Sequence, residues 1–154
     1  MNPLNILALS CAVLLGVCST RAISAQALWI ENAWIRAMPP TQRMTAGYLD
    51  IRNSGDVAVE ITGARTKIAA HAQIHVSREV DGYVSMQRLD QLTVNPGETL
   101  SLAPGGMHLM LMGMEKMPLP GTDTDICLIL SSGKEICAIA TVRKSASGVQ
   151  SQHH

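Results

Sequence analysis

The sequence of 154 residues contains no phenylalanine and only two tryptophans and two tyrosines, so aromatic side chains contribute little to any core. It also has no excess of charge, because twelve basic residues balance twelve acidic ones. This balance argues against a nucleic-acid groove or a strongly anionic partner. Valine, isoleucine, leucine and threonine are plentiful instead. Such a composition favours a small β-rich domain over a helix bundle.

The sequence also lacks an apolar run long enough to span a bilayer. Its longest uncharged apolar run, ILALSCAVLLGVC at residues 6–18, has the length of a secretory signal and is too short for a transmembrane helix. Small residues follow in AISAQA (22–27) and offer cleavage after Ala25 or Ala27. We therefore predict that residues 1–25 are a cleaved signal peptide and that the mature chain does not insert into a membrane. The alternatives are a buried element of the mature domain, or a lipoprotein anchored through Cys18, which Val17 disfavours.

The rest of the chain is predicted to be a single β-domain, residues 26–143, followed by a flexible tail, residues 144–154. Alternating apolar and polar residues recur at intervals of roughly ten residues between turn signals, and no helical segment of convincing length is present. The clearest hairpin spans residues 72–89, around the turn pair Asp81-Gly82. The pattern predicts an all-β fold, a β-sandwich or a Greek-key barrel. Further strands, with the turns that end them, are expected within residues 28–40, 46–56, 58–66, 92–114 and 125–142.

Two cysteines remain in the mature chain, Cys127 and Cys137. They are not spaced as a CxxC motif, so a thioredoxin-like activity finds no support. A three-residue loop over residues 131–133 would place them opposite each other on a hairpin. In an exported protein they could form a cross-strand disulfide; two reduced thiols that face the core are the alternative.

The segment GGMHLMLMGMEK, residues 105–116, holds a histidine and four of the nine methionines. Alternation along a strand would place Leu109 and Leu111 in the core. His108 and Met110 would then be neighbours on the opposite, solvent-facing side. Met112 and Met114 share the parity of His108 and Met110.

The hairpin at residues 72–89 supplies a second pair. A two-residue turn at Asp81-Gly82 places Ser77 opposite Met86 and makes His75 the diagonal neighbour of Met86, on the same face. Two segments therefore each present one imidazole and one thioether. If these faces meet, they form a site with two histidines and two methionines.

Such a site selects for soft metal ions. Thioethers bind Cu(I) well and bind Zn(II), Ca(II) or Mg(II) poorly, while imidazole accepts copper in either oxidation state. The four residues include no carboxylate or thiolate, so the ion would keep its charge and stay exchangeable, as a carrier requires. No acid or base for metal-assisted hydrolysis stands near them, so we do not expect an enzyme. Each residue also has an ordinary interpretation, as core filler for a methionine or a surface position for a histidine. The remaining candidates are His71 as an alternative ligand, Met38 and Met44 as loop packing or the edge of a site, and Met117 as loop packing.

The spacing of these residues is similar to a known family signature. His75, Met86, His108 and Met110 match the H-x10-M-x21-H-x-M pattern of the periplasmic PCuAC copper(I) chaperones. The segments AWIRAMPP, GYLDIRNSG and PGGMHLMLMGM also resemble that family, and the similarity extends from about Trp29 to Val142. The resemblance implies a cupredoxin-like β-sandwich that binds Cu(I) through these four residues.

The resemblance further implies a role and partners. Members of the family help to load the dinuclear copper centre of cytochrome c oxidase, so the expected location is the periplasm. The expected partners are a copper-accepting oxidase subunit or a Sco-type thiol chaperone, and the expected oligomeric state is a monomer. Ser77 departs from the methionine that many members carry there. The terminal His153 and His154 resemble a remnant of the metal-binding tail of some members, and they are candidates for a second, weak Cu(II) site.

Other functions make different demands on the sequence. A periplasmic copper-scavenging or resistance protein would need the same ligands and would not deliver copper. A cupredoxin electron carrier would need a cysteine ligand beside the histidines, and neither Cys127 nor Cys137 is close to them in sequence. A structural sandwich domain without metal would lose no property when His75 and His108 are replaced.

Overall fold

A computed structural model of the chain describes residues 27–144, which form ten β-strands and contain no helix. Within this range no helix is therefore available to cross a membrane. The all-β prediction is confirmed. The predicted signal peptide and most of the predicted tail lie outside the described residues. The strands are β1 (Leu28–Arg36), β2 (Met44–Asn53), β3 (Val59–Arg65), β4 (His71–Val80), β5 (Tyr83–Leu89), β6 (Leu92–Val94), β7 (Thr99–Leu102), β8 (Met107–Met112), β9 (Asp123–Leu130) and β10 (Glu135–Arg143).

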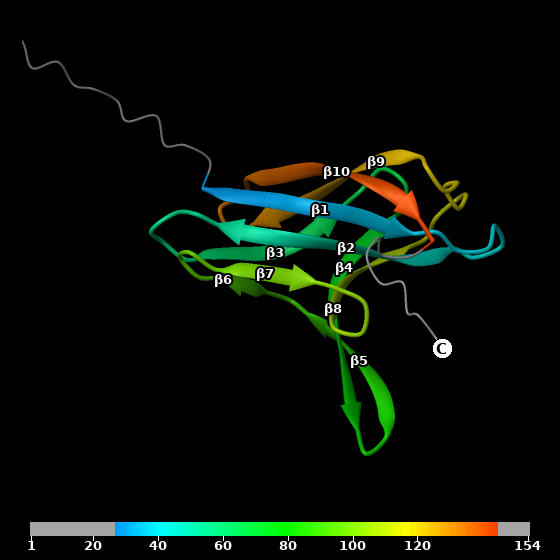
Figure 1. Ribbon diagram of the computed structural model, residues 1–154, viewed down its shortest axis with the longest axis horizontal. Helices are drawn as coiled ribbons and strands as arrows, with labels where there is room; N and C mark the ends of the chain where they lie inside the picture. The colour runs from blue at the N-terminus through cyan, green and yellow to red at the C-terminus, as the bar shows by residue number, and fades with distance from the viewer. Residues whose placement is uncertain (1–26, 145–154) are drawn as a thin grey trace, which may run out of the picture.

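Seven of the strands pair in a closed circuit, β3–β9–β10–β1–β2–β8–β4 and back to β3 (Figure 1). Neighbouring strands of this circuit are antiparallel except β1 and β10, which are parallel. The circuit closes through one residue pair, Ala64 with Ala72, whereas β4 and β8 are joined by six pairs. Closure protects the circuit from the exposed edges of an open sheet. The short strands β6 and β7 add to β3 and β2, and β5 adds to β4.

The core consists of aliphatic side chains from alternate positions of these strands. Leu109 and Leu111 are both 0% exposed, as the alternation in the methionine-rich segment predicts. The two aromatic residues that are buried, Trp34 and Tyr48, pack against each other with ring centroids 4.5 Å apart. The main core cluster contains neither ring and is built from residues such as Ile35, Ile51, Ile61, Leu102, Leu128 and Val142.

The two hairpins have the registers expected from their turns. Asp81 and Gly82 both have positive φ, 53° and 79°, which a type I′ turn requires. Ser77 accordingly pairs with Met86. In the second hairpin Cys127 pairs with Cys137, and the two are joined by a disulfide. This result settles the choice between a bridge and two thiols that the sequence left open.

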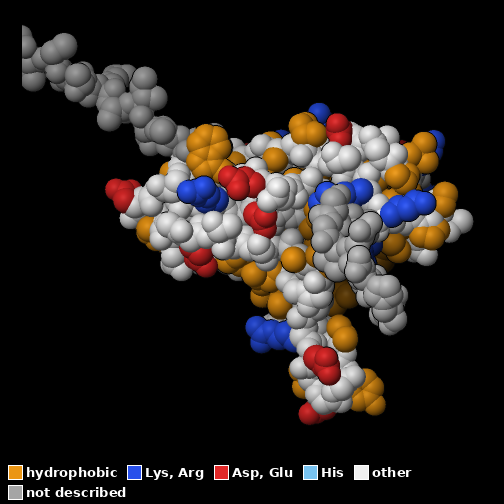
Figure 2. Space-filling view, viewed as in Figure 1, with side chains coloured by type: hydrophobic (Ala, Val, Ile, Leu, Met, Phe, Trp, Pro, Cys, Tyr) orange, Lys and Arg blue, Asp and Glu red, His pale blue; other side chains and the backbone are white. Residues whose placement is uncertain are grey.

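The far part of the β4–β5 hairpin, residues 77–86, projects from the barrel and is called the finger below (Figure 1). Its exposed apolar side chains gather among charged ones (Figure 2). β4 pairs with β8 only as far as Val76, so in the finger β4 has β5 as its ladder partner. Four large apolar side chains of the finger are 56–80% exposed: Val80, Tyr83, Val84 and Met86.

Candidate metal centre

The two predicted histidine ligands lie opposite each other on adjacent strands. His75 in β4 pairs with His108 in β8, and their ring centroids are 6.1 Å apart. Side chains that are paired in this way project from the same face of the sheet. Residues 33 positions apart in sequence are thereby brought together by the long-range pairing of β4 with β8.

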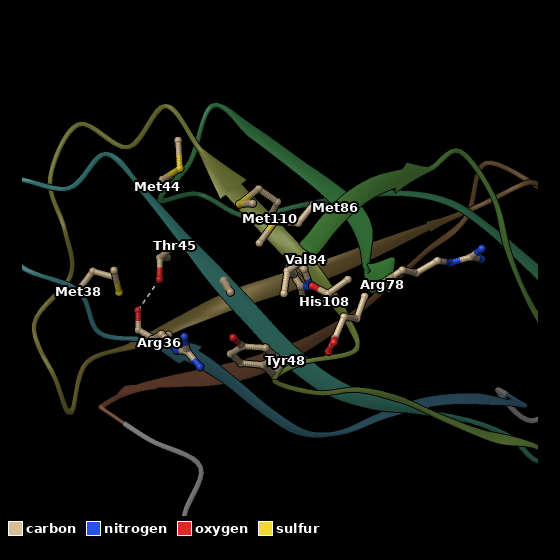
Figure 3. A pocket seen from close by; sticks show the side chains of 14 residues that line it. Arg36, Met38, Met44, Thr45, Tyr48, Arg78, Val84, Met86, His108 and Met110 are labelled. Carbon is tan, nitrogen blue, oxygen red and sulfur yellow. Dashed lines mark hydrogen bonds between the residues drawn. The ribbon is translucent and has the colours of Figure 1, made fainter. Parts of the chain in front are cut away.

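The two predicted methionine ligands occupy neighbouring positions on the same face. Met110 follows His108 two residues along β8, and Met86 in β5 lies across from Ser77, diagonal to His75. Met86, Met110 and His108 line one cavity of about 600 Å³ (Figure 3). His75 adjoins His108 but is not among the residues that line this cavity.

Their exposure differs from the solvent-facing site expected from sequence. His108 is only 6% exposed, whereas Met86 is 57% exposed. Met110 and His75 are intermediate. The centre therefore runs from a buried imidazole to a thioether at the surface. Met114, which was expected on this face, is 2% exposed and lies in the core, because Gly113 with φ of 71° ends the strand alternation before it.

Hydrogen bonds select one nitrogen of each imidazole for a metal. His108 Nδ1 lies 3.1 Å from the carbonyl oxygen of Gly106, which can only accept, so Nδ1 carries the proton. His75 Nε2 lies 3.1 Å from Gln73 Oε1 and donates to it in the same way. The lone pairs are then on His108 Nε2 and His75 Nδ1. His75 Nδ1 is buried and has no hydrogen-bond partner among the described residues.

The charge state of His75 suits a ligand. Burial lowers the pKa of His75, and the nearby charges of His108 and Arg88 lower it further. The imidazole is therefore neutral at neutral pH and has a free lone pair. A buried nitrogen without a partner is unfavourable unless something binds it, so this atom fits a metal ion.

Two methionines that the sequence left as loop packing or the edge of a site lie at the cavity. Met38 and Met44 are 37% and 51% exposed and line it (Figure 3). Arg36 also lines it and lies over the ring of Tyr48, 5.5 Å from its centroid. Met44, Ala46 and Tyr48 alternate along β2, and this alternation in the sequence could have placed these three residues on one face of the strand. Met117 is 4% exposed, in accord with the packing role expected for it.

Among the described residues, one cluster of histidine, cysteine, aspartate or glutamate side chains has the composition of a metal site. Cys127, Glu135 and Cys137 present ligand atoms within 4.8 Å of one another. The two sulfurs are joined in the disulfide and so are not thiolates. Glu135 is instead held by Arg65, and this interaction lowers the pKa of Glu135. This cluster is a structural one.

Solved structures with the same fold include PCuAC domains. The copper-bound PCuAC domain from PmoF2 is 23% identical with a TM-score of 0.65, and the match covers 78% of this chain and 95% of that one. The solution structure of CuI-DR1885 from Deinococcus radiodurans is 28% identical with a TM-score of 0.60, and covers 82% and 83% of the two chains. The resemblance inferred from the sequence motif is thus confirmed by fold.

Sequence comparison gives the family itself. A lipoprotein from Leifsonia xyli subsp. xyli, "Putative lipoprotein Lxx21020", is 30% identical over 130 residues, 84% of this chain and 76% of the relative. The family described as "Putative lipoprotein LpqE-like" matches residues 28–142, which include every strand of the barrel but the last residue of β10. The chain therefore belongs to the LpqE-like family.

Proposed function

We propose that the protein is a non-enzymatic carrier of Cu(I), which it binds through His75, Met86, His108 and Met110. The observation that carries this proposal is the cross-strand pair of His75 and His108, with an unpartnered buried nitrogen on His75 and two thioethers on the same face. Two neutral imidazoles and two thioethers are a donor set that favours Cu(I) over Zn(II). The copper-bound domain from PmoF2 and CuI-DR1885 support the choice of metal.

The graded exposure of the ligands suits a cargo that has to be released. His108 anchors the ion in the buried part of the centre, and Met86 covers it from the surface. All four donors are neutral, so the ion keeps its positive charge and is not locked in place by ion pairing. Ligands of a partner can approach from the side of Met86 and replace the thioethers one at a time.

For the destination, we propose the dinuclear copper centre of cytochrome c oxidase, reached by transfer to an oxidase subunit or a Sco-type thiol chaperone in the periplasm. The family and the Leifsonia relative are both described as lipoproteins, which supports export. That description also favours attachment through Cys18 as the alternative to cleavage after Ala25. Mass spectrometry of the N-terminal peptide from the native host distinguishes a lipidated cysteine from a free Gln26.

The test of the carrier is a Cu(I) titration in competition with Zn(II), followed by transfer. We expect one tightly bound Cu(I), weak zinc binding, and loss of the tight site in both His75→Ala and His108→Ala. Equal or stronger zinc binding would contradict the two-thioether site. The loaded protein is then mixed with a copper-free oxidase subunit. Failure of copper to move would leave a storage or resistance protein as the better description.

A further inference from the structure

A second set of soft donors lies on the same face of the sheet, at the ends of three neighbouring strands. Met112 is the last residue of β8, and it pairs with Met44, the first residue of β2, on one side. On its other side it pairs with His71, the first residue of β4. The three residues therefore form one row across β2, β8 and β4.

Met112 lies one strand away from each of the other two residues, so the register allows the three donors to converge on one ion. Paired side chains on adjacent strands have Cβ atoms about 4.5–5.5 Å apart, and methionine and histidine side chains reach further than that toward a common point. Met44 is 51% exposed and His71 is exposed, while Met112 is intermediate. The donors are thus open to solvent, and none of the three is committed to the core.

The row lies apart from the first centre along the strands, and Met110 lies between the two. His71 precedes His75 by four residues and Met112 follows His108 by four, which corresponds to about 13 Å along a strand. Met110 lies on the row between them, opposite Gln73 and Ala46. Two singly charged ions at that separation repel each other only weakly near water, so both positions can be filled at once.

We propose that Met44, Met112 and His71 form a second, weaker Cu(I) site, at the rim of the barrel where these strands end. The proposal rests on the proposed function, because it assumes that the same face carries Cu(I). Two thioethers and one imidazole select the same soft ion. The site is weaker because it has one imidazole fewer and lies in solvent. An ion passes between the two positions by exchange of ligands at Met110, and it stays Cu(I) throughout.

The experiment follows each methionine separately. The chain from Gln26 onward, which contains all described residues, is labelled with 13C in the methionine methyl groups and titrated with Cu(I) without oxygen. We expect the Met86 and Met110 signals to move during the first equivalent, and those of Met44 and Met112 during the second. Because the signals are assigned to residues, copper bound by His153 and His154 is not mistaken for the new site.

Variants test the row directly. His71→Ala should raise the dissociation constant of the second ion at least about tenfold and change that of the first less than about twofold. Met112→Leu should act likewise, whereas its matched control, Met107→Leu on the other face of β8, should leave both unchanged. In the His75→Ala, His108→Ala double variant, Met44 and Met112 should still respond.

Any of three outcomes would overturn the second site. The first is that the Met44 and Met112 signals do not move through three equivalents of Cu(I), and the second is that they move together with the Met86 signal in the first equivalent. The third is that His71→Ala leaves the dissociation constant of the second ion unchanged. In each case a tight first equivalent at Met86 and Met110 would leave the carrier function standing. Absence of any response at Met86 and Met110 would instead refute the proposed function.

Discussion

In the barrel, core residues such as Ile35, Ile51 and Leu109 are 0% exposed, whereas in the finger Tyr83 is 80% and Val84 70% exposed. Both regions consist of antiparallel strands with apolar residues, so the difference comes from what they pack against. The barrel strands have neighbours on both edges, and the finger has only its own partner strand. Burial of apolar area is the main source of stability, so the barrel supplies it and the finger does not. The predicted copper ligands lie where the two regions join, which allows stability and metal binding to be changed separately.

The largest effect is expected from Leu109→Ala. This residue is fully buried between the two proposed copper ligands of β8, and its truncation should cost about 2–5 kcal/mol of unfolding free energy. Chemical denaturation of the copper-free protein measures the loss. Copper stoichiometry of the folded fraction should not change. If Met110→Leu destabilised the protein as much as Leu109→Ala, the division of β8 into a core face and a ligand face would be wrong.

Removal of the disulfide should have the next largest effect. Replacing Cys127 and Cys137 together by alanine opens a loop of 10 residues, which should cost on the order of 2–3 kcal/mol. The bridge joins β9 and β10, in the barrel and away from the finger, so Cu(I) affinity should be unaffected. A thermal melt with and without reductant gives the comparison. An unchanged melting temperature in the double variant would show that the bridge does not stabilise the barrel.

Substitution of two glycines with similar φ angles allows the stability of the finger to be compared with that of the barrel. Gly82 in the finger and Gly97 in a turn of the barrel have φ of 79° and 73°, and a Cβ at either would meet nothing within 4 Å. Gly97→Ala should therefore cost about 1 kcal/mol from backbone strain alone. Gly82→Ala should cost less global stability, because the finger can open locally and relieve the strain. Equal losses in denaturant titrations would mean that the finger unfolds together with the barrel.

The smallest effect on stability is expected at the finger surface. Met86→Leu keeps the volume of a side chain that is 57% exposed, so the unfolding free energy should change by less than about 0.5 kcal/mol. Cu(I) affinity should nevertheless fall, because a thioether donor is lost. Val80→Thr in the same hairpin is the matched control, because Val80 is 56% exposed and does not line the cavity, and it should change neither quantity. A Met86→Leu variant with wild-type copper affinity would remove this residue from the ligand set.

The local parts of this structure follow from the sequence, and the long-range parts do not. The turns at Asp81-Gly82 and residues 131–133 determine the registers of their hairpins, so the Ser77–Met86 and Cys127–Cys137 pairs could be predicted. The pairing of His75 with His108 depends on the placement of β4 beside β8, which no local signal determines. The sequence therefore predicts two histidine–methionine pairs, but it does not predict that the two pairs lie next to each other.

The solvent exposure of the proposed ligands could not be predicted from the sequence either. Alternation assigned His108 to the face opposite the leucines, and that face was taken as solvent-facing. In the structure, residues of β1, β2 and the finger surround this face, and His108 is 6% exposed. Met38 and Met44 reach the same cavity from the first part of the chain. Whether these two methionines line the cavity depends on packing between strands that are distant in sequence. The periodicity along one strand does not determine that packing.

The one-pair closure between Ala64 and Ala72 has a consequence for local opening. Because β3 holds β4 so weakly, β4 and β5 are attached to the rest of the barrel mainly through β8. They form the unit expected to separate first in native-state hydrogen exchange. His75 and Met86 belong to that unit, while His108 and Met110 belong to the rest of the barrel. A bound copper ion would join the two, so amide protons of β4 and β5 should exchange more slowly when the metal is present and recover their faster exchange when it departs.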